Sequence, residues 1–384
     1  MNSIHPKLET LMITTRYPWE PIEIIELIKR DNIEEFKKIY NTAEQLPDSV
    51  NNSLTQYSAM FNKSPTVLCI AAYYNALQIA DYLLQIGVLP DDADQFFRAP
   101  VHFAAMMDHV SFIIFLSSHG ADINATDITN RLYIHWAAEN NCVKVLQYAI
   151  MSGANIDAQA ADGCPIHLAC KTGSFRAIEI LAKTGKVNLN RIVHDRSPLL
   201  HVMNSSCLEA LPILFEYGMD INQNIVGNWT ALHYVVRAGS PYVVGFLCKY
   251  GANPNIPLDK SYKWFPMHVA AQEHHSKIIT ILYYNGSLIH SLTHAKNSPF
   301  TLSKPYHKRD NQYGKASITI RNYVIDFFAR SILLMFLTEQ IPSNFEEMVT
   351  KSTKKYNMEM GVVKEAMVTY EMNKIPVNKP KKDV

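Results

Sequence analysis

The stretch PVHFAAMMDHVSFIIFLSSHGADINATD, residues 100–127, decides the fold because its landmarks recur along the chain. The first histidine of this stretch, His102, begins a series with steps of 33, 32, 34, 32 and 35 residues. The series is His102, His135, His167, His201, His233 and His268, with Cys69 one step earlier. In all seven cases the residues just before and after are apolar. A period of this length is the signature of a repeat architecture.

A second series of landmarks keeps step with the first. It consists of Gly87, Gly120, Gly153, Gly185, Gly218, Gly251 and Gly286. Each glycine follows its histidine (or Cys69) by 17 or 18 residues, whereas the next histidine comes 14 to 17 residues later. We interpret the constant part as two short helices, because an extra residue there would rotate an apolar face out of register. The variable part is predicted to be an exposed loop, where insertions cost little.

Turn and cap residues fit this division. A turn between the two helices is expected six residues after each landmark, at Asn75, Asp108, Asn141, Gly173, Cys207, Gly239 and His274. Five of these seven are Asn, Asp or Gly, which tolerate the left-handed conformation. The glycine of the second series is expected to cap the second helix at its C-terminus.

The pattern resembles the ankyrin repeat, whose signature is T-P-L-H-x-A-A, then a helix, then G-A-D/N-φ-N. The second part stands here as GADINATD (120–127), GANIDAQ (153–159), GMDINQN (218–224) and GANPNIP (251–257). The resemblance covers roughly residues 64–301 and implies an all-α solenoid of helix pairs, each with a β-turn or hairpin finger. Met203–Asn204 and Val235–Val236 depart from the small Ala–Ala pair, so bulkier packing is expected there.

The ends of the chain differ from the repeats, so three domains are expected. Residues 1–63 are predicted to hold a helical capping repeat at 22–40 and then a loop. Residues 64–303 form the ankyrin repeat domain. Residues 304–384 form a C-terminal helical cap with a basic tail, in which the apolar stripe from 320 to 335 covers the last repeat.

Composition excludes several classes of protein. A net charge of +1 gives no basic surface for binding nucleic acid without sequence preference. No stretch is apolar and long enough for a spanning helix, and the N-terminus lacks the pattern of a signal peptide. The six scattered cysteines are typical of buried thiols in a reducing compartment, so the expected location is the cytoplasm, with the nucleus as an alternative.

Neither a metal site nor a catalytic site is expected. One histidine per repeat places the rings about 10 Å apart, too far to share an ion. Each ring is instead expected to bond backbone groups of neighbouring repeats. Glu273–His274–His275 lacks the H-E-x-x-H spacing, and no phosphate-binding loop, dinucleotide fingerprint or nucleophile elbow is present. The sequence therefore predicts a protein that is not an enzyme and has no cofactor and no small-molecule substrate.

Candidate binding residues are those that the repeat itself does not need. In ankyrin repeats the finger tips and the last turn of the first helix line a concave surface, and the resemblance implies that their counterparts here bind a protein partner. Many are of the aromatic, Met or Arg types that are enriched in interface cores. They are Tyr73, Tyr74, Phe96, Phe97, Arg98, Met106, Met107, Arg131, Glu139, Lys171, Arg196, Trp229, Arg237, Tyr262, Lys263 and Trp264.

Two features within this set stand out. The finger between Gly251 and His268 is the longest, so Tyr262 and Trp264 are expected to project as partly exposed anchors. Separately, Asn124 and Asn222 each follow an acidic–apolar pair and a leucine eight residues earlier. This resembles the pattern that asparaginyl hydroxylases accept in ankyrin repeats, and the alternative is a structural turn asparagine.

These observations predict a non-enzymatic scaffold or adaptor that binds a protein on its concave groove and finger tips. Two alternatives remain open. One is a substrate-recognition adaptor of a ubiquitin ligase, for which helices expected at 318–372 leave room for a divergent box. The other is the cytoplasmic repeat module of a larger, membrane-associated assembly.

Overall fold

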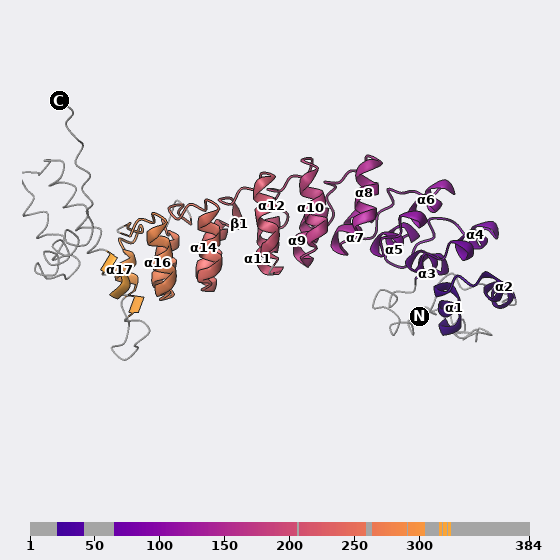
Figure 1. Cartoon of the computed structure of the whole chain (residues 1–384), viewed down its shortest axis with the longest axis horizontal. Coiled ribbons are helices and arrows are strands. Elements are labelled where there is room, and N and C mark those ends of the chain that lie inside the picture. The colour runs from indigo at the N-terminus through magenta and orange to yellow at the C-terminus, as the bar shows by residue number, and fades with distance from the viewer. Residues whose placement is uncertain are drawn as a thin grey trace, which may run out of the picture. The chain divides into compact units, whose positions relative to one another are not determined.

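The computed structural model describes residues 21–41, 65–205, 207–258, 263–289, 291–303, 315–316, 318–320 and 322–323. These residues are almost entirely helices joined by turns (Figure 1). The chain divides into two compact units, Met1–Met219 and Asp220–Val384. Each unit is described below by itself.

Unit 1 is built from consecutive pairs of short helices. The pairs are α1 (Pro21–Lys29) with α2 (Ile33–Asn41), α3 (Val67–Tyr74) with α4 (Leu77–Gln85), α5 (Pro100–Met106) with α6 (Val110–Ser118), α7 (Tyr133–Glu139) with α8 (Val143–Met151), α9 (Pro165–Thr172) with α10 (Phe175–Lys183), and α11 (Pro198–Ser205) with η3 (Leu208–Ala210) and α12 (Leu211–Glu216). First helices pack on the first helices of neighbouring pairs, and most second helices likewise on second helices. This nearest-neighbour packing is what defines a solenoid.

Unit 2 repeats the same plan. A two-stranded antiparallel hairpin, β1 (Asn224–Val226) and β2 (Trp229–Thr230), precedes α13 (Ala231–Ala238), α14 (Pro241–Lys249), α15 (Pro266–Gln272), α16 (Ser276–Tyr284) and α17 (Pro299–Leu302). Helix α13 packs on α15, α15 on α17, and α14 on α16. The hairpin is one of the predicted fingers. In unit 1 the fingers are turns, two of them closed by single bridges, Ala160 to Gly163 and Val193 to Arg196.

The predicted turns and caps are confirmed. Six of the seven turn residues have φ between 59° and 74°, in the left-handed region. Cys207 is the exception, with φ of −85°, and here the second helix begins as the 3₁₀ segment η3. All seven glycines of the second series have positive φ, from 63° to 101°, as a helix-ending glycine requires.

The predicted role of the repeat histidines is confirmed for five of them. The backbone N–H of Ala99 donates to His102 Nδ1 at 2.9 Å, so the proton lies on Nε2, which donates to the carbonyls of Ala125 and Arg131, both at 3.1 Å. His135, His167, His233 and His268 reach the following finger in the same way. Cys69 substitutes for the ring, its Sγ donating to the carbonyls of Asp92 and Arg98 at 3.5 Å. The first helices α3, α5, α7, α9, α13 and α15 are thereby tied to the next finger.

His201 is not the counterpart of the other histidines, which corrects the frame assumed from the sequence. A proline opens both α9 and α11, but His167 is the third residue of its helix and His201 is the fourth. Leu200 takes the third position. The residues at the Ala–Ala positions of α11 are consequently Val202 and Met203, so the departure from a small pair remains but is shifted by one residue.

The terminal predictions are tested only in part. Helices α1 and α2 form the expected N-terminal pair, and α17 begins where an eighth repeat was expected. Ala316 and Ile320 are buried, and the ring of Tyr323 stacks on Tyr283 at 4.2 Å, so the described part of this segment packs on α16. The rest of the stripe, the loop at 42–63 and the helices expected beyond 343 lie outside the described residues.

Candidate protein-binding surface

The finger tips of unit 1 are joined into a row by backbone hydrogen bonds. The N–H of Ile128 donates to the carbonyl of Phe96, and the N–H of Ala161 donates to the carbonyl of Thr129, both at 2.9 Å. The tips of three consecutive fingers are therefore held at fixed spacing. A row fixed in this way presents its side chains without an entropic cost of ordering the backbone on binding.

Equivalent aspartates shape the first two of these fingers. One carboxylate oxygen of Asp94 accepts the N–H groups of Phe96 and Arg98, both at 2.9 Å. One oxygen of Asp127, 33 residues later, accepts those of Thr129 at 2.8 Å and Arg131 at 3.0 Å. Short Asp side chains that bond the backbone two residues on are a standard way to hold such a turn.

The two fingers differ in the group that bonds the second carboxylate oxygen of their aspartate. Asp94 uses it to hold the guanidinium of Arg98 at 2.6 and 2.7 Å, and that guanidinium lies 4.9 Å from the ring centre of Phe103. Arg98 is therefore only 6% exposed, and its assignment to the partner surface is wrong. Met106, 4% exposed, is corrected for the same reason: its side chain packs inside the repeat.

In the next finger, the arginine is directed to other partners. The indole N–H of Trp136 donates to the second oxygen of Asp127 at 3.2 Å, so that oxygen does not hold Arg131. Arg131 lies over the Trp136 ring at 4.7 Å and donates to Glu139 at 2.7 Å and, through Nε, to Asp162 at 3.1 Å. One side chain thus links α7 to two fingers.

Electrostatics keep this group charged. Burial opposes the charge on Arg131, but the hydrogen bonds and charges of Asp162 and Glu139 outweigh it and raise the pKa of the guanidinium. Burial also opposes the charge on Asp162, but the hydrogen bond and the charge of Arg131, together with the charge of Lys171, outweigh it, so the pKa of this carboxyl is lowered. An arginine held by two carboxylates is a strong, directional arrangement.

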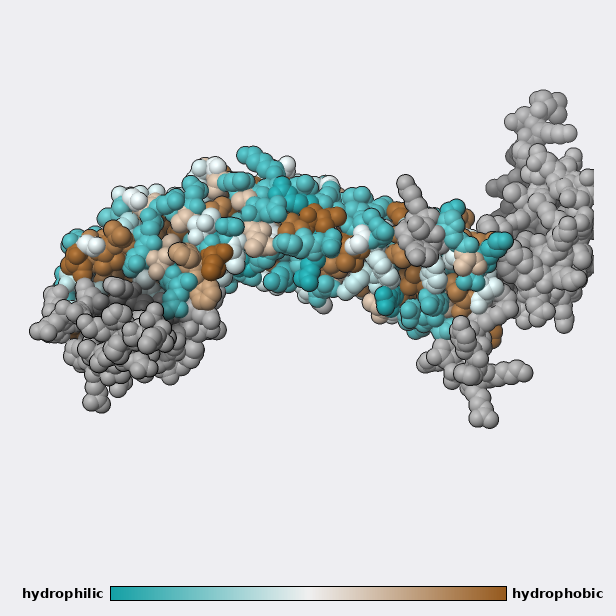
Figure 2. Space-filling model, turned by 180° about the vertical axis from the view of Figure 1, so that it is seen from behind, coloured by the Kyte–Doolittle hydropathy of each residue, from teal (hydrophilic) through white to brown (hydrophobic). Residues whose placement is uncertain are grey.

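Apolar side chains are exposed at the finger tips. Phe97 is 64% exposed and Ile128 on the neighbouring finger is 58% exposed. Phe97 also has φ of 57°, whereas the next finger uses Asn130 at the same position. A bulky residue rarely adopts this left-handed conformation. Figure 2 shows one face of the molecule, on which apolar groups lie in separate patches among hydrophilic ones.

The remaining predicted residues of unit 1 are accessible to different degrees. Tyr73 and Tyr74 are half-buried, with their rings edge to face at 5.1 Å, and Phe96 is half-buried too. Met107, Lys171 and Arg196 are exposed. The structure places Lys171 in the last turn of α9 and Arg196 at the bridge that precedes α11.

In unit 2 the structure brings together one pair of the predicted anchors. The guanidinium of Arg237 lies 5.3 Å from the ring centre of Trp229. Trp264 is half-buried with its ring 6.1 Å from that of His268, and its carbonyl accepts from His233. Lys263 is exposed, with φ of 50°. Tyr262 lies outside the described residues.

The two candidate modification sites have different surroundings. Asn222 Oδ1 accepts the N–H of Asn253 at 2.8 Å, and its Nδ2 donates to the carbonyl of Gly251 at 3.3 Å, so this side chain bridges two loops. The Asn124 side chain is exposed, while its backbone N–H donates to Asp122 at 2.8 Å. Asn124 is thus the more accessible of the two, and hydroxylation of either stays a prediction.

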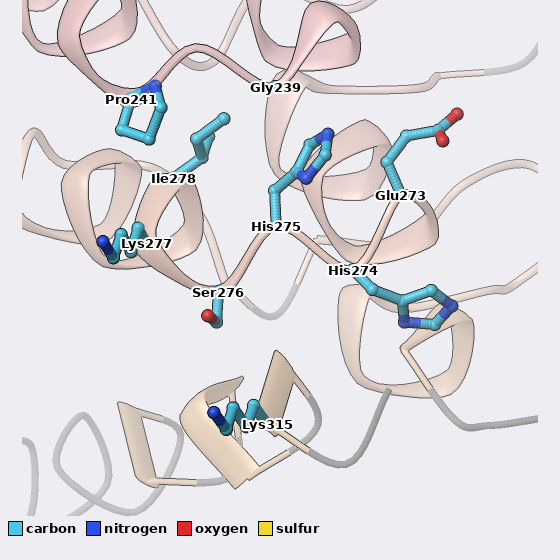
Figure 3. Close-up of a pocket in the computed structure, with 9 residues that line it drawn as sticks. All are labelled: Gly239, Pro241, Glu273, His274, His275, Ser276, Lys277, Ile278 and Lys315. Atoms are coloured by element: carbon cyan, nitrogen blue, oxygen red, sulfur yellow. The ribbon is translucent and has the colours of Figure 1, made fainter. Parts of the chain in front are cut away.

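An open cavity of about 440 Å³ in unit 2 is the other feature we considered (Figure 3). It is lined by Gly239, Pro241, Glu273, His274, His275, Ser276, Lys277, Ile278 and Lys315. The His275 ring points toward Gly239, where an added Cβ would lie 2.8 Å from it, and the other polar side chains point in different directions (Figure 3). Divergent groups do not form a catalytic arrangement.

Within the described ranges, no three His, Cys, Asp or Glu side chains come together in a way that could hold a metal ion. Among the described helices, none combines the length and hydropathy needed to cross a bilayer. Burial raises the pKa of Cys142 to about 12, and that of Cys69 and Cys170 further, so these thiols are not activated nucleophiles.

Sequence reasoning missed the role of the fingers' own charges. It did not single out Asp94 and Asp127 as the groups that decide where Arg98 and Arg131 point. The available signal was the spacing: an aspartate stands four residues before an arginine twice, one repeat apart. It also missed Ile192, an exposed apolar residue on a later finger.

Comparison with known proteins agrees with this architecture. The chain is 28% identical over 219 residues to the ankyrin repeat protein nuc-2 of Neurospora crassa, covering 55% of this chain and 20% of that one. It is 26% identical over 237 residues to the mouse B-cell lymphoma 3 protein homolog, covering 60% and 51%. The chain thus spans from about one fifth to one half of these relatives' lengths.

The solved human ASB11 ankyrin repeat domain is 20% identical, with a TM-score of 0.47, covering 59% of this chain and 98% of that one. The family profile of ankyrin repeats matches three times, at residues 29–127, 134–225 and 222–292, which together exceed half of the chain. With its paired helices, histidine-tied fingers and left-handed turns, the chain belongs to the ankyrin repeat family.

Proposed function

We propose that this chain is a non-enzymatic scaffold or adaptor that binds a protein partner on the finger surface of unit 1. We define this surface as Phe97, Met107, Ile128, Arg131, Glu139, Lys171 and Arg196. Ankyrin repeats generally mediate protein–protein interaction, and the family is generally a non-enzymatic module. The proposed location is the cytoplasm, where the free thiols of all six cysteines would stay reduced.

The observation that carries the proposal is the tip of the finger at Phe97. A large aromatic ring is 64% exposed there, on a backbone in the left-handed region. That conformation costs about 1 kcal/mol for a residue with a Cβ, and the exposed ring recovers little by packing. Ile128 on the adjacent finger extends the apolar area. A partner that covers both side chains would supply the missing burial.

A ligase adaptor stays a second candidate on a narrower basis. The cow ankyrin repeat and SOCS box protein 3 is 27% identical over 177 residues, covering 45% of this chain and 33% of that protein. A match of that length is no longer than the repeats themselves, so it supports the repeats rather than a ligase-binding box. Testing the full chain for co-purification with ligase subunits would separate this candidate from the leading one.

The experiment for the leading proposal is the pair Phe97→Gly and Ile128→Ser in the full chain. Glycine suits the left-handed backbone, so thermal stability should stay equal or rise slightly. Quantitative affinity purification should show partner proteins reduced at least about tenfold, since a lost anchor typically costs 2 kcal/mol or more. The matched control is Met151→Ser on α8, where the replaced side chain is 87% exposed. Equal recovery by all three variants and the wild type would contradict the proposal.

A further inference from the structure

Three arginines of unit 1 occupy one position of the repeat. Arg98, Arg131 and Arg196 each stand just before the N-terminal cap of a first helix, α5, α7 and α11 respectively. The first two are satisfied by carboxylates of this chain: Arg98 by Asp94, and Arg131 by Glu139 and Asp162. The third, Arg196, has different neighbours.

The groups that serve the first two arginines are replaced around Arg196. Ile192 stands where the other fingers have Asp94 and Asp127, and it is exposed. Asn204 stands at the α11 position that corresponds to Glu139 in α7. In the part of the chain that the structure describes, no carboxylate lies within ion-pair distance of Arg196. The chain supplies this arginine with none of the acidic groups found at its two counterparts.

The preceding repeat adds a second cation instead of an acid. Lys171 is the seventh residue of α9, as Glu139 is the seventh residue of α7. It is exposed, and the described residues form no ion pair with it. Asp162 is the carboxylate whose pKa the charge of Lys171 lowers, but its oxygens accept hydrogen bonds from Arg131. Two cations from adjacent repeats thus lie close to His201, and the nearby charge of Asp162 is shared with Arg131.

His201 completes the group. It occupies the fourth position of its helix, where the other repeats place Phe103, Trp136, Leu168, Tyr234 and Val269. It is only 8% exposed, and its ring lies edge to face against His167 at 6.2 Å. Among the described residues, neither of its ring nitrogens makes a hydrogen bond, in contrast to those of His167. Neither nitrogen is among the fully buried unpaired atoms of the described residues, so the edge of the ring is accessible to an acceptor from a partner.

The charges around His201 indicate which partner fits. Burial, then Arg196 and Lys171, lower the pKa of His201, and only Asp162 acts in the opposite direction. His167, the other titratable group in contact, is held neutral by burial and donates to the carbonyl of Arg191. An incoming anion would relieve the repulsion between the two cations and give His201 an acceptor.

We infer that Lys171, Arg196 and His201 form a recognition site for an acidic side chain, the carboxylate of a Glu or Asp on the partner protein. The partner's carboxylate does for Arg196 what Glu139 and Asp162 do within this chain for Arg131. Exposed Ile192 beside it offers apolar contact to the same partner segment. This inference rests on the proposed function, because it specifies the chemistry of a partner on the finger surface.

The test is selection of a displayed library of short random peptides on the full chain, followed by anisotropy measurements with the synthetic peptides recovered. The inference expects enriched peptides to carry Asp or Glu. Their affinity should fall at least about tenfold for the double variant K171E/R196E, because two charge-assisted bonds are lost and two like charges now face the peptide carboxylate. The matched control is R176E/K186E, which reverses two exposed charges elsewhere in unit 1. Replacing the acidic peptide residues by Lys should restore binding to K171E/R196E.

A second variant tests His201 separately. H201F restores an apolar residue of the kind the repeat uses, so it should fold and keep or gain thermal stability. In the wild type, affinity should rise as the pH falls from 7.5 to 5.5, because a bound carboxylate favours the protonated ring, and H201F should lose this rise.

The outcomes separate this inference from the proposed function. One outcome is peptide affinity that falls with Phe97→Gly and Ile128→Ser but stays unchanged with K171E/R196E. This outcome would overturn the acidic-group site and support the finger surface. Peptide affinity that stays unchanged in both sets of variants would overturn both the acidic-group site and the finger surface. Enriched peptides without acidic residues, or equal losses with R176E/K186E, would also overturn the site.

Discussion

Lowering the pH from 7.5 to 5 is expected to cost each unit roughly 4 kcal/mol of unfolding free energy. Burial lowers the pKa of His135 and His167 in unit 1, and of His233 and His268 in unit 2, to about 4. An unfolded chain has histidine pKa values near 6.5, so it takes up protons first. Stability is therefore full above about pH 6.5, falls as the pH drops, and stops falling below about pH 4.

The size of this effect follows from the difference between the two pKa values. At pH 5 each of these histidines contributes a loss of roughly 2 kcal/mol, with two histidines in each unit. The geometry gives the same sign, since Nδ1 of His135 accepts the N–H of Leu132 at 3.0 Å and cannot keep that bond once protonated. The interval from pH 7.5 to 5 lies above the range in which ordinary carboxyl groups titrate.

Urea denaturation of the chain at a series of pH values between 7.5 and 5 measures this directly. Replacing His135 by Gln should lower stability at neutral pH and reduce the pH-dependent loss by roughly 2 kcal/mol. If the wild type kept the same unfolding free energy at pH 6.5 and pH 5, the histidine ties would not be the buried, neutral groups described above.

Phe103→Ala is expected to destabilise unit 1 by about 3–5 kcal/mol. The ring is fully buried, and it also supports the guanidinium of Arg98 at 4.9 Å. Because a repeat contacts only its neighbours, a cavity there weakens two interfaces at once. Denaturation followed by far-ultraviolet circular dichroism gives the value.

The control for this variant is Tyr242→Ala on α14, where the side chain is 75% exposed. A surface change of this kind should stay within about 0.5 kcal/mol of the wild type. A loss below about 1 kcal/mol for Phe103→Ala would show that the first helices do not carry the core.

Much of the fold could be predicted from the sequence, because the repeat imposes the same physical demand every 33 residues or so. Left-handed turns need Asn, Asp or Gly, a helix end needs Gly, and a ring at the third helical position ties the next finger. The predicted alignment of the repeats is wrong by one residue at His201, because it places this histidine at the position of the other histidines. The proline that opens α11 gives the correct frame and places Leu200 in the tie position.

The surface could be predicted less well, because it depends on which oxygen bonds which donor. Arg98 and Arg131 look alike in the sequence, yet one is buried and the other links two fingers. The difference is the indole N–H of Trp136, which donates to the second oxygen of Asp127, whereas the same oxygen of Asp94 accepts from Arg98. Such a change of hydrogen-bond partner produces no repeating pattern that a sequence comparison could detect. The exposure of Phe97 produces no such pattern either.

Site-specific photo-crosslinking tests the central claim, that the finger surface of unit 1 binds a protein partner, most directly. A photoreactive phenylalanine is placed at position 97, at position 128 or at the exposed control position 151, in cells that naturally make the protein. We expect the same partner protein to be captured from positions 97 and 128 and not from 151. Capture of that partner from 151 alone, or equally from all three positions, would contradict the account.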